Sequence, residues 1–187
     1  MSSVTLRNKS LAITGTQEFK EETTPDSYTA LLQRTSSIKT KPLYLLGRGR
    51  FGIVTLEETK DGTYVAIKRL PLWTDKNSIS TEVELGLRFR AAKDRSFVSL
   101  LWWNTSPNGF ELAFEYMDDG CWTDLGDPSK REKNLVILSG VLRAIQRLHD
   151  DYSMAHYDIK PSNVLLDRHG RVALSDFGCA SPECARC

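Results

Sequence analysis

Three glycines, Gly47, Gly49 and Gly52, form a G-x-G-x-x-G pattern that could bring backbone amides close to phosphate oxygens, because glycine has no side chain to hold a ligand away. The residues after Gly52, from Ile53 to Glu57, have the composition of a strand. A dinucleotide-binding fingerprint needs a helix at this point, and a Walker A loop needs Lys and Ser or Thr there. The pattern therefore predicts either a β-hairpin whose tip covers phosphates or an ordinary glycine-rich turn.

Lys68 is a second candidate phosphate ligand. It ends the run Val65-Ala66-Ile67-Lys68, which predicts a strand that holds the lysine ammonium in a partly desolvated place. Phosphates and a carboxylate would make that position tolerable. We expect the carboxylate on the following helix, with Glu82 as the first choice and Glu84 as the alternative. Taken singly, each of these charges is also compatible with a solvated surface position.

Alternating apolar stretches and turn signals predict the strands that must position these residues. Asp61-Gly62 and Asn108-Gly109 are strong hairpin signals, since these residue types tolerate a positive φ. The apolar stretches cover residues 44–58, which hold two strands around the glycines, 63–70, 97–103 and 110–117. Short strands are also expected on either side of residues 167–170.

Apolar periodicity predicts two helices. The first covers residues 78–93, where Val83, Leu87 and Ala91 are spaced by four and Ser80 or Thr81 lies near the start. The second is longer and carries an apolar stripe at spacings of three and four, formed by Leu135, Leu138, Leu142, Ile145 and Leu148.

The composition is that of an ordinary globular protein, with 187 residues of which 40% are apolar and 26% charged. The formal net charge of +1 gives no electrostatic reason to expect nucleic acid or a membrane as a partner. The first 15 residues lack the apolar run of a secretory signal. We therefore expect an intracellular protein, cytoplasmic or nuclear, whose four cysteines are reduced thiols.

Six motifs occur in an order and spacing that resemble the eukaryotic protein kinase catalytic domain: GRGRFGIV, VAIK, a helical Glu, FEYM, HYDIKPSN and DFG. The resemblance covers roughly residues 42–180. The pattern Asp-x-Lys-Pro-x-Asn is similar to the Ser/Thr form of the catalytic loop. The resemblance thus implies an enzyme that uses ATP and Mg²⁺ to phosphorylate Ser or Thr of protein substrates, and it leaves room for a kinase or regulatory partner.

The same resemblance implies an α+β fold of the protein kinase type. We expect a flexible Ser/Thr-rich tail at residues 1–40 and a kinase-like domain at residues 41–187. Within that domain, a five-stranded antiparallel small lobe with one helix would occupy about residues 41–117, and a partial helical large lobe residues 118–187.

Catalytic roles follow from the resemblance residue by residue. Asp158 would accept or orient the proton of the substrate hydroxyl, and Lys160 would neutralise charge on the transferring phosphoryl group. Asn163 and Asp176 would hold magnesium through oxygen atoms, which are the ligands that this ion prefers. For Asp158, Asn163 and Asp176 the alternative is a role in turns or helix caps.

The resemblance also implies a set of residues around ATP, in which apolar side chains enclose the adenine and backbone groups near Glu115 and Met117 contact its edge. The apolar members would equally satisfy plain core packing. The set consists of Leu46, Gly47, Gly49, Gly52, Val54, Ala66, Lys68, Glu115, Met117 and Leu165.

Two residues depart from the family pattern. Tyr157 stands where most of the family has an Arg that pairs with a phosphorylated residue, and a phenol cannot make that charge-assisted pair. If Glu82 forms the ion pair with Lys68, Gly86 stands where a bulky side chain should contact His156 and Phe177. We expect glycine to leave a gap there and to weaken the helix by roughly 1 kcal/mol relative to Ala.

The third departure concerns the large lobe, because only CASPECARC follows Asp176-Phe177-Gly178 and no Ala-Pro-Glu motif occurs. The leucine stripe of the second helix should then expose an apolar patch. We expect little transfer to proteins from residues 1–187 alone, and the alternative function is a nucleotide-binding or interaction fragment, a pseudokinase or decoy. The spacing Cys179-x4-Cys184-x2-Cys187 is compatible with a metal site completed by Cys121 or a His, although four unrelated thiols are the simpler interpretation.

Overall fold

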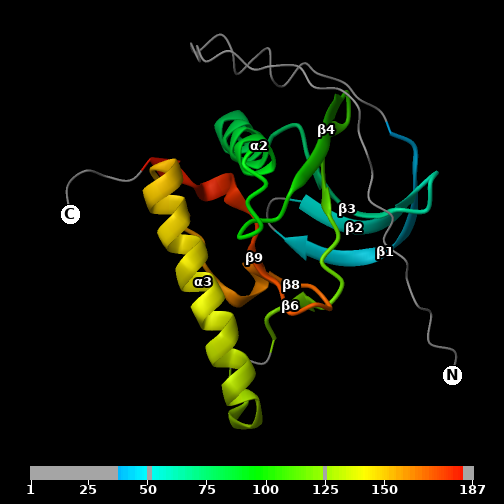
Figure 1. Cartoon of the computed structure of the whole chain (residues 1–187). Helices are drawn as coiled ribbons and strands as arrows, with labels where there is room; N and C mark the ends of the chain where they lie inside the picture. The colour runs from blue at the N-terminus through cyan, green and yellow to red at the C-terminus, as the bar shows by residue number, and fades with distance from the viewer. Residues whose placement is uncertain (1–37, 50–51, 124–125, 183–187) are drawn as a thin grey trace, which may run out of the picture. The chain divides into compact units, whose positions relative to one another are not determined.

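The computed structural model describes residues 38–49, 52–123 and 126–182 (Figure 1). These residues form two compact units: residues 38–72 with 102–116, and residues 73–101 with 117–182. A division near residue 117 was predicted, but the helix expected in the small lobe makes its contacts within the second unit. Most of the predicted tail, together with Cys184 and Cys187, lies outside the described residues.

The first unit is built on a five-stranded sheet with the order β1-β2-β3-β5-β4, and the predicted antiparallel architecture is confirmed. Both predicted hairpin glycines have a positive φ, 81° at Gly62 and 140° at Gly109. At Gly109 a side chain would also overlap the carbonyl oxygen of Leu70. The strands are β1 (Thr40–Gly49), β2 (Gly52–Thr59), β3 (Tyr64–Leu70), β4 (Leu100–Ser106) and β5 (Gly109–Glu115).

A buried carboxylate joins three strands of this sheet. Glu57 on β2 is fully buried, and its Oε1 lies 2.6 Å from Arg69 Nη1 on β3. The hydroxyl of Thr40 on β1 donates to Glu57 Oε2 at 2.6 Å, and Thr55 donates to Oε1 at 2.7 Å. Arg69 Nε also donates to Glu111 on β5 at 2.8 Å. Four strands are therefore linked through one guanidinium and its acceptors.

The second unit contains two helices, α2 (Lys76–Ala91) and α3 (Arg131–Tyr152). Helix α2 begins earlier than predicted because Asp75 is its N-cap, with carboxylate oxygens that accept from the amides of Asn77 and Ser78. The suggested caps Ser80 and Thr81 lie inside the helix. The short strands of this unit are β6 (Gly120–Cys121), β7 (Met154–Ala155), β8 (Val164–Leu166), β9 (Val172–Leu174) and β10 (Ser181–Pro182).

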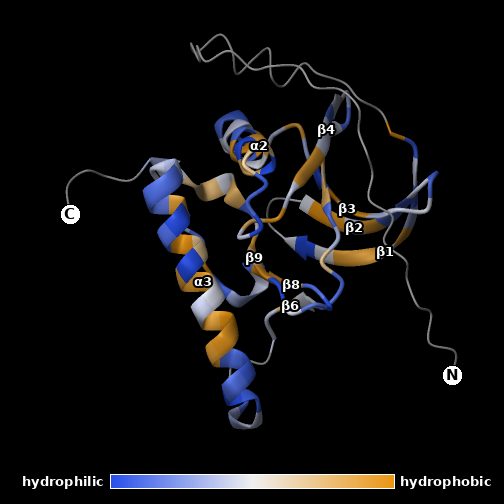
Figure 2. Cartoon of the chain, viewed as in Figure 1, coloured by the Kyte–Doolittle hydropathy of each residue, from blue (hydrophilic) through white to orange (hydrophobic). Residues whose placement is uncertain are grey.

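Helix α3 buries a different stripe from the one predicted. Its buried residues are Ile137, Val141, Ala144, Leu148 and Tyr152. Of the predicted stripe, only Leu148 is fully buried, while Leu135, Leu138 and Leu142 are 57%, 43% and 59% exposed. The prediction of an exposed apolar patch on this helix is confirmed, and Figure 2 shows the apolar colour along the middle of α3.

Gly86 on α2 leaves no gap, which contradicts the expectation from the sequence. It is buried, and a Cβ added to it would lie 2.6 Å from the Cβ of Leu100. The space is therefore already filled by Leu100, which is fully buried. Glycine allows the helix backbone to lie directly on this leucine.

Glu57→Gln should lower the free energy of unfolding by about 2 kcal/mol at neutral pH, because it removes the charge from a buried hydrogen-bonded pair. Burial raises the pKa of Glu57, but the bonds from Arg69, Thr40 and Thr55 outweigh it and hold the pKa below its ordinary 4.5. The stabilisation is then complete above pH 4.5 and lost as the pH falls through the folded-state pKa. Urea unfolding at pH 7 and pH 3 should show the difference between the proteins shrinking in acid, and a constant difference would contradict it. Glu58→Gln is the matched control.

Gly86→Ala should destabilise the protein, although the same change in an exposed helix stabilises it by roughly 1 kcal/mol. Forcing a methyl group against Leu100 costs about 1–3 kcal/mol. In the Leu100→Ala background, Gly86→Ala should become neutral or stabilising, because the methyl group then enters vacated space. Urea unfolding of the four proteins measures this coupling. Additive effects would show that Leu100 is not the obstacle.

Candidate active site

The glycine pattern joins two paired strands, which fits both of the predicted alternatives. Gly47 on β1 pairs with Val54 on β2, and Gly49 pairs with Gly52. The two strands are therefore paired up to these last two glycines. Gly52 has a φ of 141°, and a side chain there would overlap the carbonyl oxygen of Arg69. At Gly47 and Gly49 an added Cβ would meet no atom within 4 Å. Packing therefore explains the glycine at 52 but not those at 47 and 49, where the backbone is open to a ligand.

One face of the sheet carries three of the predicted nucleotide residues. Val54 on β2 is directly opposite Lys68 on β3, and Ala66 lies two residues before Lys68. Because side chains alternate along a strand, these three point to the same side, together with Phe114 opposite Ala66. Val54, Ala66 and Lys68 are all half-buried.

The remaining nucleotide residues are distributed over both units. In the first unit, Leu46 on β1 is 39% exposed and Glu115 ends β5. In the second unit, Met117 is buried and its carbonyl oxygen accepts from the amide of Gly120 at 3.2 Å. Leu165 lies on β8, half-buried, opposite Cys121.

Burial separates the two candidate glutamates on α2. Glu82 is only 3% exposed, whereas Glu84 is half-buried. Glu82 also faces the residues after Asp176, because its Oε2 lies 3.6 Å from where a Cβ of Gly178 would be. A buried carboxylate needs a partner, so burial favours Glu82 as the functional residue.

Asp158 is held by two side chains of its own loop. Lys160 Nζ donates to Asp158 Oδ2 at 2.6 Å, and Asn163 Nδ2 donates to the same oxygen at 3.1 Å. Asn163 Nδ2 also donates to the Asp158 carbonyl oxygen at 2.8 Å. The Lys160 bond is the main reason why the pKa of Asp158 is lowered and that of Lys160 is raised. Asp158 is therefore an ionised carboxylate at neutral pH.

His156 connects this loop to the segment that precedes Asp176. It is 2% exposed, and its Nε2 lies 3.0 Å from the carbonyl oxygen of Ser175. The amide of Asp158 donates to His156 Nδ1 at 3.3 Å, so the neutral ring donates through Nε2. Burial lowers the pKa of His156, which keeps it neutral. The amide of Ser175 donates to the Asn163 carbonyl oxygen at 3.0 Å and completes the connection.

Asp176 has a left-handed backbone conformation, with φ 65° and ψ 70°, which a non-glycine residue rarely adopts. The side chain that follows, Phe177, is buried, and its ring lies 4.8 Å from His156 and 4.9 Å from Phe89. Phe89 in turn stacks on Phe97 at 4.0 Å. Deep packing of Phe177 therefore supports the unusual backbone at Asp176.

Asn163 and Asp176 fit a magnesium site that is completed by phosphates and water. Asn163 uses its Nδ2 for Asp158, which leaves the Oδ1 oxygen outside those bonds. The described residues contain no group of three His, Cys, Asp or Glu side chains placed to hold a metal. Mg²⁺ commonly takes one or two protein oxygens and keeps water or phosphate at its other positions, so this small donor set suits it.

Tyr157, which departs from the family pattern, is 64% exposed and has a φ of 60°. It makes no ion pair within the described part of the chain, whereas its neighbours His156 and Asp158 are both bonded. The substitution leaves the loop around Asp158 intact.

An aromatic cluster and a carboxylate beside it were not predicted from the sequence. Tyr152 packs edge-on against Phe89 at 4.9 Å, and its hydroxyl donates to Asp94 at 3.3 Å. Arg147 Nε also donates to Asp94, at 2.7 Å. Asp94 and Arg147 are 53 positions apart, and no local pattern connects them.

Comparison with known proteins decides the family. The model of the protein kinase domain matches residues 41–183, which is most of the chain. The chain belongs to the protein kinase family. The sequence-based assignment to the eukaryotic Ser/Thr type is thereby supported, because similar proteins carry that description in their names.

Two relatives illustrate the similarity. The chain is 34% identical over 163 residues to the LRR receptor-like serine/threonine-protein kinase SIK1 of Oryza sativa subsp. japonica, covering 82% of the chain and 16% of the relative. It is 32% identical over 165 residues to the LRR receptor-like serine/threonine-protein kinase ERECTA of Arabidopsis thaliana, covering 84% of the chain and 17% of the relative. The chain thus spans less than a fifth of the length of these relatives. Within the described residues, no helix is long and apolar enough to cross a bilayer.

Lys160→Met should raise the pKa of Asp158 toward its ordinary value, because the hydrogen bond and the positive charge that favour the carboxylate are both removed. Carbon-detected NMR titration of the aspartate carboxyl groups measures this directly. Lys133→Met is the control, since Lys133 pairs with the exposed Asp119 at 3.7 Å. An Asp158 titration that is identical in wild type and Lys160→Met would refute the role of Lys160.

Proposed function

We propose that this chain carries the catalytic apparatus of a protein kinase that transfers the γ-phosphate of ATP to Ser or Thr of proteins. The observation that carries the proposal is the ionised Asp158, bonded to Lys160 and Asn163 within one loop. The His156–Ser175 bond ties that loop to the segment before Asp176. A base, a cation and two oxygen donors are the parts that phosphoryl transfer requires.

The first unit binds the nucleotide in this proposal. Val54 and Ala66 enclose the adenine from one face of the sheet, and Lys68 on the same face binds phosphate oxygens. Leu46 adds apolar surface to the adenine site, and the backbone near Glu115 contacts the edge of the ring. The open backbone at Gly47 and Gly49 supports a close approach to the phosphates.

The second unit supplies the chemistry. Asp158 orients the hydroxyl of the substrate and accepts its proton, and Lys160 lies beside it to offset negative charge on the phosphoryl group. Asn163 and Asp176 would hold magnesium, which would supply positive charge to offset that of the phosphates. Positioning provides most of the rate in such a reaction, so the bonds that fix Asp158 are as important as its charge.

A nucleotide-binding or interaction fragment remains the second candidate function. The observation in its favour is the exposed apolar side of α3, where Leu135 and Leu142 are each more than half exposed. Such a surface favours association with another protein. Binding of ATP without transfer would support this candidate over the kinase.

Lys68→Met should weaken Mg-ATP binding by about tenfold or more, because a charge-assisted phosphate contact is lost. Asp158→Asn should retain the binding and reduce transfer by roughly 10²-fold or more, because it removes the base. Thermal shift with millimolar Mg-ATP measures the binding, and radiolabel transfer to a Ser- and Thr-rich protein measures the chemistry. Lys60→Met, in the exposed β2–β3 turn, is the control for loss of charge. Equal ATP responses of wild type and Lys68→Met would reject Lys68 as the phosphate ligand.

A further inference from the structure

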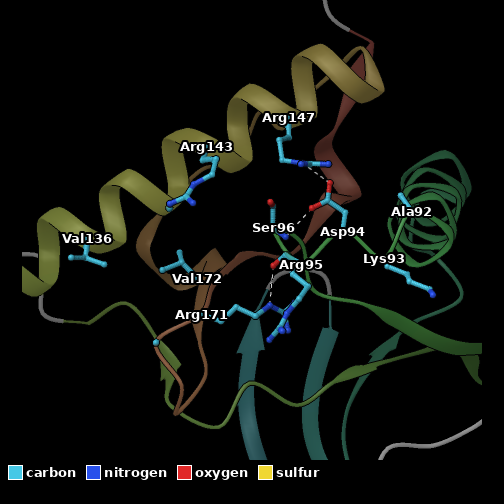
Figure 3. Close-up of a pocket in the computed structure, with 12 residues that line it drawn as sticks. Ala92, Lys93, Asp94, Arg95, Ser96, Val136, Arg143, Arg147, Arg171 and Val172 are labelled. Carbon is cyan, nitrogen blue, oxygen red and sulfur yellow. Dashed lines mark hydrogen bonds and ion pairs between the residues drawn. The ribbon is translucent and has the colours of Figure 1, made fainter.

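The second unit contains a pocket of about 560 Å³ whose lining includes none of the proposed catalytic or nucleotide-binding residues (Figure 3). Its walls are the loop after α2, from Ala92 to Ser96, one side of α3, and the turn that leads into β9. None of the residues placed in the active site lines it. The volume falls within the usual range of sites for small ligands or single side chains, roughly 300–1,000 Å³.

The lining is strongly basic, with five cationic side chains and one carboxylate. The carboxylate, Asp94, is already engaged, because it accepts from Arg147 Nε and from the amide of Ser96 at 3.0 Å. Arg147 is further held by Asp151 at 3.2 Å. Asp94 therefore offsets the charge of Arg147, with which it forms an ion pair.

Three of these cations have no acidic partner among the residues that the structure describes. They are Lys93, Arg95 and Arg143, and all three are exposed. Figure 3 shows the Arg143 side chain extending from α3 into the hollow, with Val172 below it. Ser96 lies beside the same space, and both its amide and its hydroxyl hydrogen-bond to Asp94. The donors that extend into the pocket are therefore the N–H groups of the Arg143 guanidinium.

The floor of the pocket is closed and does not have to form on binding. Gly140 on α3 lies directly on β9, because a Cβ added to it would be 2.8 Å from the Cβ of Val172. Arg171 fixes the adjoining turn by donating to the carbonyl oxygens of Arg95 at 2.9 Å and Phe97 at 3.0 Å. These contacts pre-organise the walls, which lowers the entropic cost of binding.

We propose that this pocket binds a phosphorylated Ser or Thr side chain in a peptide segment of a partner protein. A phosphate carries up to about two negative charges and three acceptor oxygens, which suit the fork of N–H donors of Arg143. The net charge of the whole chain is only +1, so the excess of positive charge is local. A compact anion fits a local excess better than an extended polyanion does. The proposal does not depend on the catalytic function, because the two sites share no residue.

NMR titration of the ¹⁵N-labelled full chain tests the proposal. The probe is an eight-residue peptide of Ala and Gly with one central phosphothreonine, compared with the same peptide carrying Thr or Glu. Saturable shifts at the Ser96 amide and the Arg143 Nε–H are expected with the phosphopeptide, and at least about tenfold weaker binding with the other two. Arg143→Gln should weaken phosphopeptide binding by about tenfold or more, and Arg143→Lys by less, because it keeps the charge and loses the fork.

Arg131→Gln is the matched control, because it removes an exposed charge from the same helix outside the pocket. It should change the affinity by less than about twofold. Equal affinity for the Thr peptide, or no effect of Arg143→Gln, would overturn the proposal. Binding of inorganic phosphate as tightly as the phosphopeptide would overturn the peptide as ligand. Arg143-dependent binding to phosphatidylserine vesicles, without competition by the phosphopeptide, would assign the surface to membranes instead.

Discussion

The packing of Phe177 is the interaction on which the second unit depends most. Its ring contacts Phe89 of α2 and His156 of the catalytic loop, and Phe89 stacks on Phe97. A buried aromatic group contributes large apolar area and a defined orientation. The elements that present Glu82, Asp158 and Asp176 therefore converge on one apolar cluster, and a change at any of its rings reaches the polar residues around it.

Hydrogen bonds at the edge of this cluster fix the positions of its rings. Tyr152 contributes its ring to the cluster and its hydroxyl to Asp94, which also accepts from Arg147. His156 similarly has one side against Phe177 and donates to Ser175. Apolar packing alone tolerates sliding, whereas hydrogen bonds to buried groups specify position. The basic pocket is thus linked to the aromatic cluster through the bond between Asp94 and Tyr152. The catalytic loop is linked to the same cluster through the contact between His156 and Phe177.

The two faces of the sheet in the first unit carry different groups of residues, one with an ion-pair network and one with the proposed nucleotide-binding residues. Lys68, Ala66 and Val54 share one face, while the buried Glu57 forms an ion pair with Arg69 on the other. The alternation of side chains along β2 and β3 makes this division possible within a few residues. The charged network stabilises the sheet, and ligand binding is proposed for the opposite face. Variants at Glu57 should therefore change the free energy of unfolding, and variants at Lys68 the binding of nucleotide.

The sequence by itself determined the features that depend on neighbours along the chain. These are the five strands and the hairpin glycines Gly62 and Gly109. The Asp158 loop belongs to the same class, since Lys160 and Asn163 reach it from two and five positions away. Turn chemistry and strand alternation are short-range effects, so local patterns are sufficient to predict them.

Only the tertiary structure decided which side of α3 is buried, why residue 86 is glycine, and that Glu57 is in the interior. Leu135 and Ile137 are both apolar, and the local pattern does not say which of them meets the core. Leu100, 14 positions away, leaves no space for a side chain at Gly86. Arg147, 53 positions away, donates a hydrogen bond to Asp94. The burial of these residues depends on which segment, distant in sequence, packs against them. The packing of the whole unit decides this, and no local stretch of sequence does.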